Sequence, residues 1–308
     1  MSGRAEQLLT RLEWTVVRRL DGLLQGDYRT LMRGAGLDLA DLREYQYHDD
    51  VRHIDWNVTA RLQIPHVRQF TEDREMAAWF LVDLSPSVDF GSRDVRKRTL
   101  SGEFVGVLAR LLTRHGNRVG ALLYGAGVDT VIPPGNSRRH VLRLLHSLVT
   151  RPTLLRPGVT DLKALLDAAL RTIHQRGSIF VISDFISQPG WEKPLGQLVQ
   201  RHDVLAVRVV DPLERSLPDL GMLVMHDPET GEQITVDTQN AGFRRRFAEL
   251  AKARDVEIRE AFVKAGVDAL ELVTDGDLVD AVVRFVELRK RRMALSSGGL
   301  PQHLRATG

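Results

Sequence analysis

One carboxylate and two hydroxyl groups stand at alternate positions directly after an apolar run. The run covers residues 77–82 (AAWFLV), and it is followed by Asp83, Ser85 and Ser87 in the segment DLSPS. An apolar run without helical spacing that ends in a polar turn predicts a buried parallel strand. Ligands of open α/β sheets bind beyond the carboxyl ends of such strands. The turn offers only hard oxygen atoms, which suit Mg²⁺ or Mn²⁺ rather than zinc.

This Asp-x-Ser-x-Ser spacing resembles the metal-ion-dependent adhesion site of von Willebrand factor type A domains. That pattern also has a Thr in a later loop and an Asp at the end of a later strand. Both are present here: Thr160 precedes a predicted helix at 162–173, and Asp184 follows the apolar run of a predicted strand at 178–185.

The resemblance implies a role for each of these residues. Ser85, Ser87 and Thr160 would contact the metal directly, and Asp83 and Asp184 would hold it directly or through water. One coordination position would stay open for an Asp or Glu carboxylate of a protein partner. Hydroxyl groups are neutral ligands, so two carboxylates leave Mg²⁺ electrophilic enough to accept a third.

Other interpretations use the same residues. Asp83 and Ser85 would cap the next helix and Thr160 another, which leaves a metal-free scaffold but does not explain Asp184. Alternatively, a metal at the same turn would serve a hydrolase in which Asp83 activates water. A haloacid-type phosphatase needs a second Asp where Ser85 stands. The sequence contains no Walker-type loop and no Gly-x-Ser-x-Gly elbow, so we expect a binding protein rather than an enzyme.

A second informative block covers residues 25–76 and is dense in Arg, Asp and aromatic residues. Its motifs are Arg33-Gly34-Ala35-Gly36, Arg43-Glu44-Tyr45, Asp49-Asp50-Val51-Arg52-His53-Ile54-Asp55-Trp56 and Thr59-Ala60-Arg61. The composition predicts a compact layer held by Arg–carboxylate pairs. A separate metal cluster of His48, Asp49, Asp50, His53 and Asp55 is an alternative, but the spacing matches no known zinc pattern.

These motifs, followed directly by the strand and its Asp-x-Ser-x-Ser turn, resemble the bacterial family of unknown function numbered fifty-eight (DUF58). His48 departs from the family pattern, which usually has Gly at this position. The resemblance implies a von Willebrand type A-like domain. It also implies a partner, since genes of this family commonly lie beside MoxR-type AAA+ ATPases that are thought to act in the assembly or remodelling of protein complexes.

Composition limits the classes of protein. The chain has 308 residues, 43% apolar and 27% charged, with no cysteine and a formal net charge of +3. These values are ordinary for a globular protein and exclude disulfides, Fe–S clusters and thiolate zinc sites. No apolar run approaches the roughly 18 residues of a membrane span, and the N-terminus lacks the apolar core of a signal peptide. We therefore expect no transmembrane segment and a cytoplasmic location.

Two basic clusters, Arg244–Arg246 and Arg289–Arg292, lie on predicted helices. A solvated helix face is the preferred interpretation, and contact with an acidic partner is the alternative. No aromatic residues are interleaved with them, so we expect no nucleic-acid binding.

Alternating strand and helix patterns predict the α/β class, with a mainly parallel, doubly wound sheet and helices on both faces. Residues 1–76 are expected to form an N-terminal amphipathic helix (1–24) and the motif block packed on the main domain. Residues 77–295 form that domain, and 296–308 a disordered tail. A strand at 118–124 and a short strand at 128–132, ended by Pro133, predict one hairpin. A second hairpin is expected as an insertion over 221–237.

Overall fold

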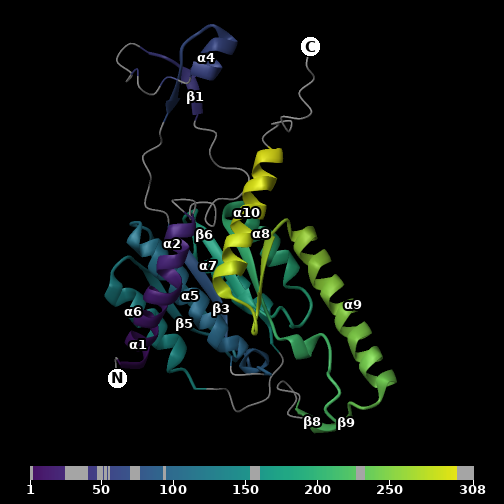
Figure 1. Ribbon diagram of the computed structural model, residues 1–308. Coiled ribbons are helices and arrows are strands. Elements are labelled where there is room, and N and C mark those ends of the chain that lie inside the picture. Colours follow the sequence, from purple (N-terminus) through teal and green to yellow (C-terminus); the bar gives the residue numbers. More distant parts are fainter. Residues whose placement is uncertain are drawn as a thin grey trace, which may run out of the picture.

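A six-stranded sheet forms the centre of the computed structural model, which describes residues 3–24, 41–46, 51, 54, 56–69, 77–92, 95–152, 160–226 and 233–296. The strand order is β10-β7-β6-β3-β4-β5 (Figure 1). All neighbouring strands are parallel except β4 and β5. The bounds are β3 Ala77–Asp83, β4 Arg118–Tyr124, β5 Val128–Gly135, β6 Ser178–Ser183, β7 Asp203–Val210 and β10 Asp268–Val273. The predicted mainly parallel sheet is confirmed.

Helices cover both faces of this sheet. The bounds are α1 Gly3–Leu12, α2 Arg18–Leu24, α5 Lys97–Arg114, α6 Arg138–Val149, α7 Leu162–Thr172, α8 Glu192–Arg201, α9 Ala241–Ala265 and α10 Leu278–Ser296. Side chains of a strand alternate between faces, so β3 contributes to two separate cores. Phe80 packs in the core with α1, α5, α6 and α10. Leu81 packs in the core with α7, α8 and α9.

The predicted N-terminal helix is present over the described residues 3–24. It consists of α1, a π-helical segment at Glu13–Val17 and α2. Leu9, Leu12, Val17 and Leu20 are buried and join the core on the α5 side of the sheet. The apolar stripe of this helix is therefore satisfied by packing within the chain.

The strand predicted at 128–132 is longer than expected. Strand β5 continues through Pro133 and Pro134 to Gly135. It pairs with β4 alone, at the edge of the sheet. A proline on the open side of an edge strand does not interrupt a ladder, because its missing N–H would have no partner there. The prediction that Pro133 ends the strand was wrong.

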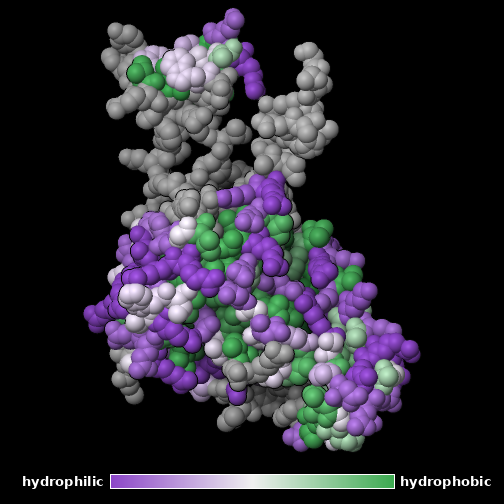
Figure 2. Space-filling model, in the orientation of Figure 1, coloured by the Kyte–Doolittle hydropathy of each residue, from purple (hydrophilic) through white to green (hydrophobic). Residues whose placement is uncertain are grey.

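The second predicted hairpin is a separate two-stranded sheet of β8, Met222–His226, and β9, Gln233–Asp237. Its side chains Met222, Val224 and Ile234 are each more than half exposed. Figure 2 shows the apolar surface that gathers at this hairpin.

Another small sheet pairs β1, Asp41–Glu44, with β2, His66–Gln69, and helix α4, Trp56–Leu62, lies between them in the chain. Most of the remaining motif block lies outside the described residues, and so do the candidate cluster residues His48, Asp49, Asp50, His53 and Asp55. The predicted Arg–carboxylate layer and its packing on the main domain stay predictions. The expected tail begins later than predicted, because Ser296 belongs to α10, and residues 297–308 lie outside the described part.

Among the described helices, none is both long and apolar enough to cross a membrane.

Two glycines allow a matched test of this packing. A Cβ on Gly177, just before β6, would lie 2.3 Å from the backbone oxygen of Ala77 in the neighbouring strand. A Cβ on Gly102, inside α5, would meet no atom within 4 Å. We expect Gly177→Ala to lower the free energy of unfolding by about 1–3 kcal/mol. Gly102→Ala should raise it by about 0.5–1 kcal/mol, because alanine favours the helix. Urea unfolding of both variants measures these changes, and equal effects would contradict the described contact between β3 and β6.

Candidate functional site

The direction of the chain through the sheet reverses between β3 and β6. From β3 the chain proceeds to β4 and β5 on one side, and then returns to β6 and β7 on the other. Ligands of open α/β sheets bind at such a switch point, beyond the carboxyl ends of the strands. Asp83 is the last residue of β3, and Asp184 follows the last residue of β6. The predicted strand ends thus meet at the switch point.

Asp83 is fully buried and holds the turn that follows it. Its Oδ1 accepts a hydrogen bond of 2.9 Å from the amide of Ser85, and its Oδ2 accepts one of 2.7 Å from the hydroxyl of Ser183 in β6. The hydroxyl oxygens of Ser85 and Ser87 lie 3.1 Å apart, and both residues are buried. One carboxylate and three hydroxyl groups therefore occupy a single buried cluster.

The helix-capping alternative is not supported for these residues. Ser85 precedes the short 3₁₀ helix η3, Pro86–Asp89, but its side chain makes no capping hydrogen bond. The cap of α7 is Asp161, whose side chain accepts from the amide of Ala164, and not Thr160. The interpretation of Asp83, Ser85 and Thr160 as helix caps was wrong.

Thr160 is buried in a loop that is fixed to the segment after Asp184. Its carbonyl oxygen accepts hydrogen bonds from the Ser187 hydroxyl at 2.9 Å and from the Gln188 amide at 3.0 Å. The next amide, that of Asp161, donates to the hydroxyl of Tyr124 at the end of β4. The loop of Thr160 is therefore held beside the carboxyl ends of β4 and β6.

A buried lysine contacts the second carboxylate. The Nζ of Lys97, in the first turn of α5, lies 2.8 Å from Asp184 Oδ2 and 2.5 Å from Glu214 Oε1. Its side chain has no exposed surface. Burial alone would lower the pKa of the Lys97 ammonium, but Asp184 and Glu214 outweigh it and hold the pKa above the ordinary value. The site therefore contains a fixed positive charge.

The turn that contains Glu214 is fixed by a capping box and by an ion pair of the next residue, Arg215. It ends the short helix η4, Pro212–Glu214, where it forms a capping box with Asp211. The hydroxyl of Thr274 and the amide of Ser92 donate to Asp211. Burial raises the pKa of Asp211, but these hydrogen bonds outweigh it and hold the pKa below the ordinary value. The following residue, Arg215, forms a bidentate ion pair with Glu271 of β10.

The electrostatics of Asp83 are unusual. Its burial first, and the nearby charge of Asp184 second, raise the pKa of Asp83 from 3.8 to about 6. Lys97 ion-pairs with Asp184 rather than with Asp83. Among the described residues, no Lys, Arg or His forms an ion pair with Asp83. At neutral pH, a negative charge at Asp83 is therefore buried without an ion-pair partner among the described residues.

The residues fit a hard divalent cation in type, with one restriction. Two carboxylates and the hydroxyl groups of Ser85, Ser87 and Thr160 are oxygen donors of the kind that Mg²⁺ and Mn²⁺ accept. The restriction is Asp184, because Lys97 and the amide of Ile186 each hydrogen-bond one of its oxygens. Within the described ranges no three His, Asp or Glu side chains form a metal-binding group. A metal here would depend mainly on Asp83 and the hydroxyls.

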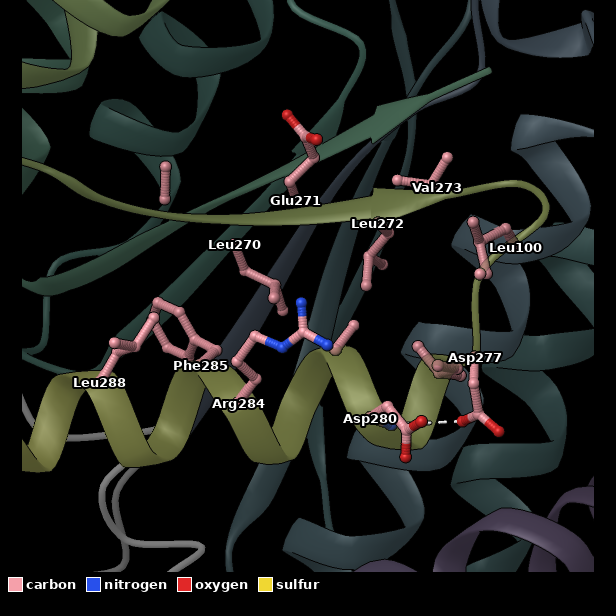
Figure 3. A pocket seen from close by; sticks show the side chains of 14 residues that line it. Leu100, Leu270, Glu271, Leu272, Val273, Asp277, Asp280, Arg284, Phe285 and Leu288 are labelled. Carbon is pink, nitrogen blue, oxygen red and sulfur yellow. Dashed lines mark hydrogen bonds between the residues drawn. The ribbon is translucent and has the colours of Figure 1, made fainter. Parts of the chain in front are cut away.

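A separate hollow of about 390 Å³ lies between edge strand β10 and helix α10. Figure 3 shows Leu270 and Leu272 pointing toward α10, and Phe285, Arg284 and Leu288 lining the other side. None of the five predicted site residues lines it. It is an apolar gap in packing with a polar rim, and it brings no catalytic or metal-binding groups together.

One residue of the basic cluster at 289–292 does not lie on a solvated helix face. The side chain of Arg289 is 3% exposed and forms ion pairs with Asp203 at 2.8 Å and Asp268 at 3.3 Å. It fastens α10 to the starts of β7 and β10. The preferred interpretation of this cluster was therefore wrong at Arg289. In the other cluster, Arg244 donates to the carbonyl oxygen of Gln239 and lies 3.5 Å from Asp219.

Four residues of the site were not predicted: Lys97, Ser183, Glu214 and Tyr124. Lys97 lies 87 residues from Asp184 and 117 residues from Glu214 in sequence. No local spacing reveals such a contact. Ser183 had a usable signal, because it is a polar residue in an apolar strand next to Asp184.

Comparison with protein-family models identifies one family. The profile described as "Protein of unknown function DUF58" matches residues 41–257. The chain is 38% identical over 285 residues to the uncharacterized proteins Rv1480 of Mycobacterium tuberculosis and Mb1516 of Mycobacterium bovis, covering 92% of this chain and 89% of each relative.

Among solved structures, the chain is similar to the conserved hypothetical protein BatB from Bacteroides thetaiotaomicron. The TM-score is 0.45 at 15% identity, and the match covers 70% of this chain and 99% of that one.

The raised pKa of Asp83 gives a test in the absence of metal. The folded chain binds this proton more tightly than the unfolded chain, so stability should fall as pH rises from about 4 to about 6 and stay lower above that range. The expected fall is about 2–3 kcal/mol for a shift of about two units. Asp83→Asn should remove this fall, because an amide does not ionise there. Urea unfolding in EDTA at several pH values measures it. Asp275→Asn, in an exposed turn, is the control and should keep the wild-type profile. Burial also raises the pKa of Glu214, so the test is the difference between variants, and a fall of unchanged size in Asp83→Asn contradicts the assignment.

Proposed function

Because this chain belongs to the DUF58 family, we propose that it is a metal-dependent protein-binding module whose site is the switch point between β3 and β6. Asp83, Ser85, Ser87 and Thr160 would hold Mg²⁺ or Mn²⁺, and Asp184 would assist through water. The bound metal would supply an electrophilic position for the carboxylate of a protein partner. The chain's own residues exclude solvent and fix the orientation of the oxygen donors.

The observation that carries this proposal is the burial of Asp83 beside Asp184. Two carboxylates that share a buried site repel each other, and their charged forms need a cation. Lys97 offsets Asp184 and is shared with Glu214. A divalent cation next to the Asp83 turn would neutralise the remaining charge, and the buried hydroxyls of Ser85 and Ser87 would complete its oxygen ligands.

The family resemblance suggests the partner. We propose a MoxR-type AAA+ ATPase, with the present chain as adaptor in the assembly or remodelling of protein complexes. A cytoplasmic location accords with such a partner. The hydrolase alternative gains no specific support from the geometry of the described residues.

A metal-free scaffold is the second candidate, and one contact favours it. The Lys97 ammonium already lies 2.8 Å from Asp184, so an internal cation occupies part of the place where a metal charge would act. In this case Lys97 and the hydrogen bonds from Ser85 and Ser183 would stabilise the two carboxylates without metal.

Metal binding can be tested by melting. Mg²⁺ or Mn²⁺ should raise the melting temperature of the full chain, because an ion that binds only the folded state stabilises it. Asp83→Asn keeps the hydrogen-bond acceptor toward Ser85 but loses the charge, and it should lose this rise. Co-purification of a MoxR-type ATPase from the same organism should require Mg²⁺ and fail in EDTA or with Asp83→Asn. Asp275→Asn is the control. An equal rise in Asp83→Asn would contradict the proposal.

Replacement of Lys97 separates the two candidates. Lys97→Met leaves Asp184 buried without its ion pair, so the metal-free variant should lose about 3–5 kcal/mol of stability. If a metal acts at this site, the stabilisation by Mg²⁺ should be larger in the variant than in the wild type, because a competing cation is gone. Glu214→Gln, which keeps the Lys97–Asp184 pair, is the matched control. If the protein is a metal-free scaffold, Mg²⁺ should raise the stability of neither Lys97→Met nor the wild type.

A further inference from the structure

A wide cavity with an arginine rim lies behind the Asp83 turn. Its volume is about 610 Å³, and it is enclosed by α1, the start of α5, the end of α6 and the turn after β3. Five arginines line it: Arg4, Arg11, Arg96, Arg98 and Arg151. Among the described residues of the lining, Asp89 is the one acidic side chain. We call this feature the arginine cavity.

The inner arginines are rigid. Arg98 pairs with Asp89 at 3.2 Å and donates a hydrogen bond of 2.5 Å to the carbonyl oxygen of Arg151. Arg151 in turn forms a bidentate ion pair with Asp129 of β5. Their side chains are only 15% and 11% exposed. A carboxylate therefore offsets the charge of each inner arginine, and the free positive charge of the cavity comes from the outer arginines.

The outer arginines are exposed and come from two different helices. Arg4 and Arg11 lie on α1, and Arg96 stands immediately before α5. Arg11 pairs with Glu103. Within the described part of the chain, neither Arg4 nor Arg96 forms an ion pair. The positive end of the α5 dipole adds to the charge on the same side. The cavity therefore has more positive than negative charge, spread along its rim.

We propose that the arginine cavity binds an acidic segment of a protein partner, with several Asp or Glu side chains. Guanidinium groups bind carboxylates in bidentate geometry, and groups placed on two helices suit carboxylates that are spaced along a chain. Leu8, Leu84 and Leu148 supply an apolar wall for the aliphatic parts of the segment. None of the lining residues that the structure describes is aromatic, and aromatic stacking surfaces are what single-stranded nucleic acids use.

The cavity is next to the proposed metal site but does not depend on it. Leu84 follows Asp83 directly, and Asp89 ends the helix η3 that starts after Ser85. One short segment of the chain therefore connects the two places. Because none of the five arginines needs a bound metal, the cavity can be tested with the metal removed.

The test is binding of a fluorescently labelled short poly-glutamate peptide to the full chain in EDTA, followed by anisotropy. We expect binding that weakens with salt, as for exposed charge pairs. The double variant Arg4→Glu/Arg96→Glu should bind about tenfold or more weakly, because two attractions become repulsions. Both side chains are exposed, and melting curves check that the variant is folded.

A matched variant measures the general effect of charge. Arg245→Glu/Arg259→Glu changes the net charge by the same amount on exposed positions of α9, away from the cavity (Figure 1). It should bind the peptide nearly as well as the wild type. Equal weakening in both variants, or no binding by the wild type, would overturn the proposal. Displacement of the peptide by inorganic tripolyphosphate at lower concentration than by unlabelled poly-glutamate would also overturn it, in favour of a small polyphosphate ligand.

Discussion

Two carboxylates forced together at the carboxyl ends of adjacent parallel strands are the constraint on which this site depends. The register pairs Val82 of β3 with Ile182 of β6, so the next residues, Asp83 and Ser183, are direct neighbours and Asp184 follows. Both carboxylates are almost completely buried. In a medium of low dielectric constant their repulsion is large, and three nearby polar groups reduce it. The Ser183 hydroxyl, the Ser85 amide and the Lys97 ammonium all act in this way.

The position of Lys97 links this site to distant parts of the fold. Lys97 begins α5, whose residues Leu100, Phe104 and Leu108 pack in the core on one face of the sheet. Its second partner, Glu214, is set by the turn after β7, and that turn is fixed to β10 through Arg215 and Glu271. A substitution in α5 or β10 can thus change the charge balance at Asp184 without touching it. We infer that edge strand β10 influences the site by placing Glu214.

Strands and turns that depend on a local pattern of residues could be predicted from the sequence. Apolar runs of about seven residues identified β3, β6 and β7, because strands buried on both faces lack alternation. The Asp83 turn and the Asp184 strand end followed from the same runs. Features that depend on contacts across the fold could not be predicted. Arg289 has the sequence environment of an exposed basic helix end, but its partners, Asp203 and Asp268, start two strands that lie far apart in the chain. A proline ends most strands. Pro133 is tolerated within β5 only because β5 lies at the edge of the sheet.

The ionised carboxylate of Asp83 lowers the stability of the folded chain at neutral pH, and this cost bears on its role. Burying a charge that has no ion-pair partner costs free energy, because its desolvation is not repaid by attraction to an opposite charge. An asparagine at position 83 would keep the hydrogen bond from the Ser85 amide and avoid the repulsion with Asp184. The folded chain instead holds a carboxylate whose pKa is raised to about 6, so that its ionisation at neutral pH opposes folding. Strongly perturbed groups of this kind gather at functional sites, where the charge is needed for binding or chemistry. The perturbed carboxylate lies at the strand-order reversal and accepts a hydrogen bond from the buried hydroxyl of Ser183, and this placement supports the proposed cation site.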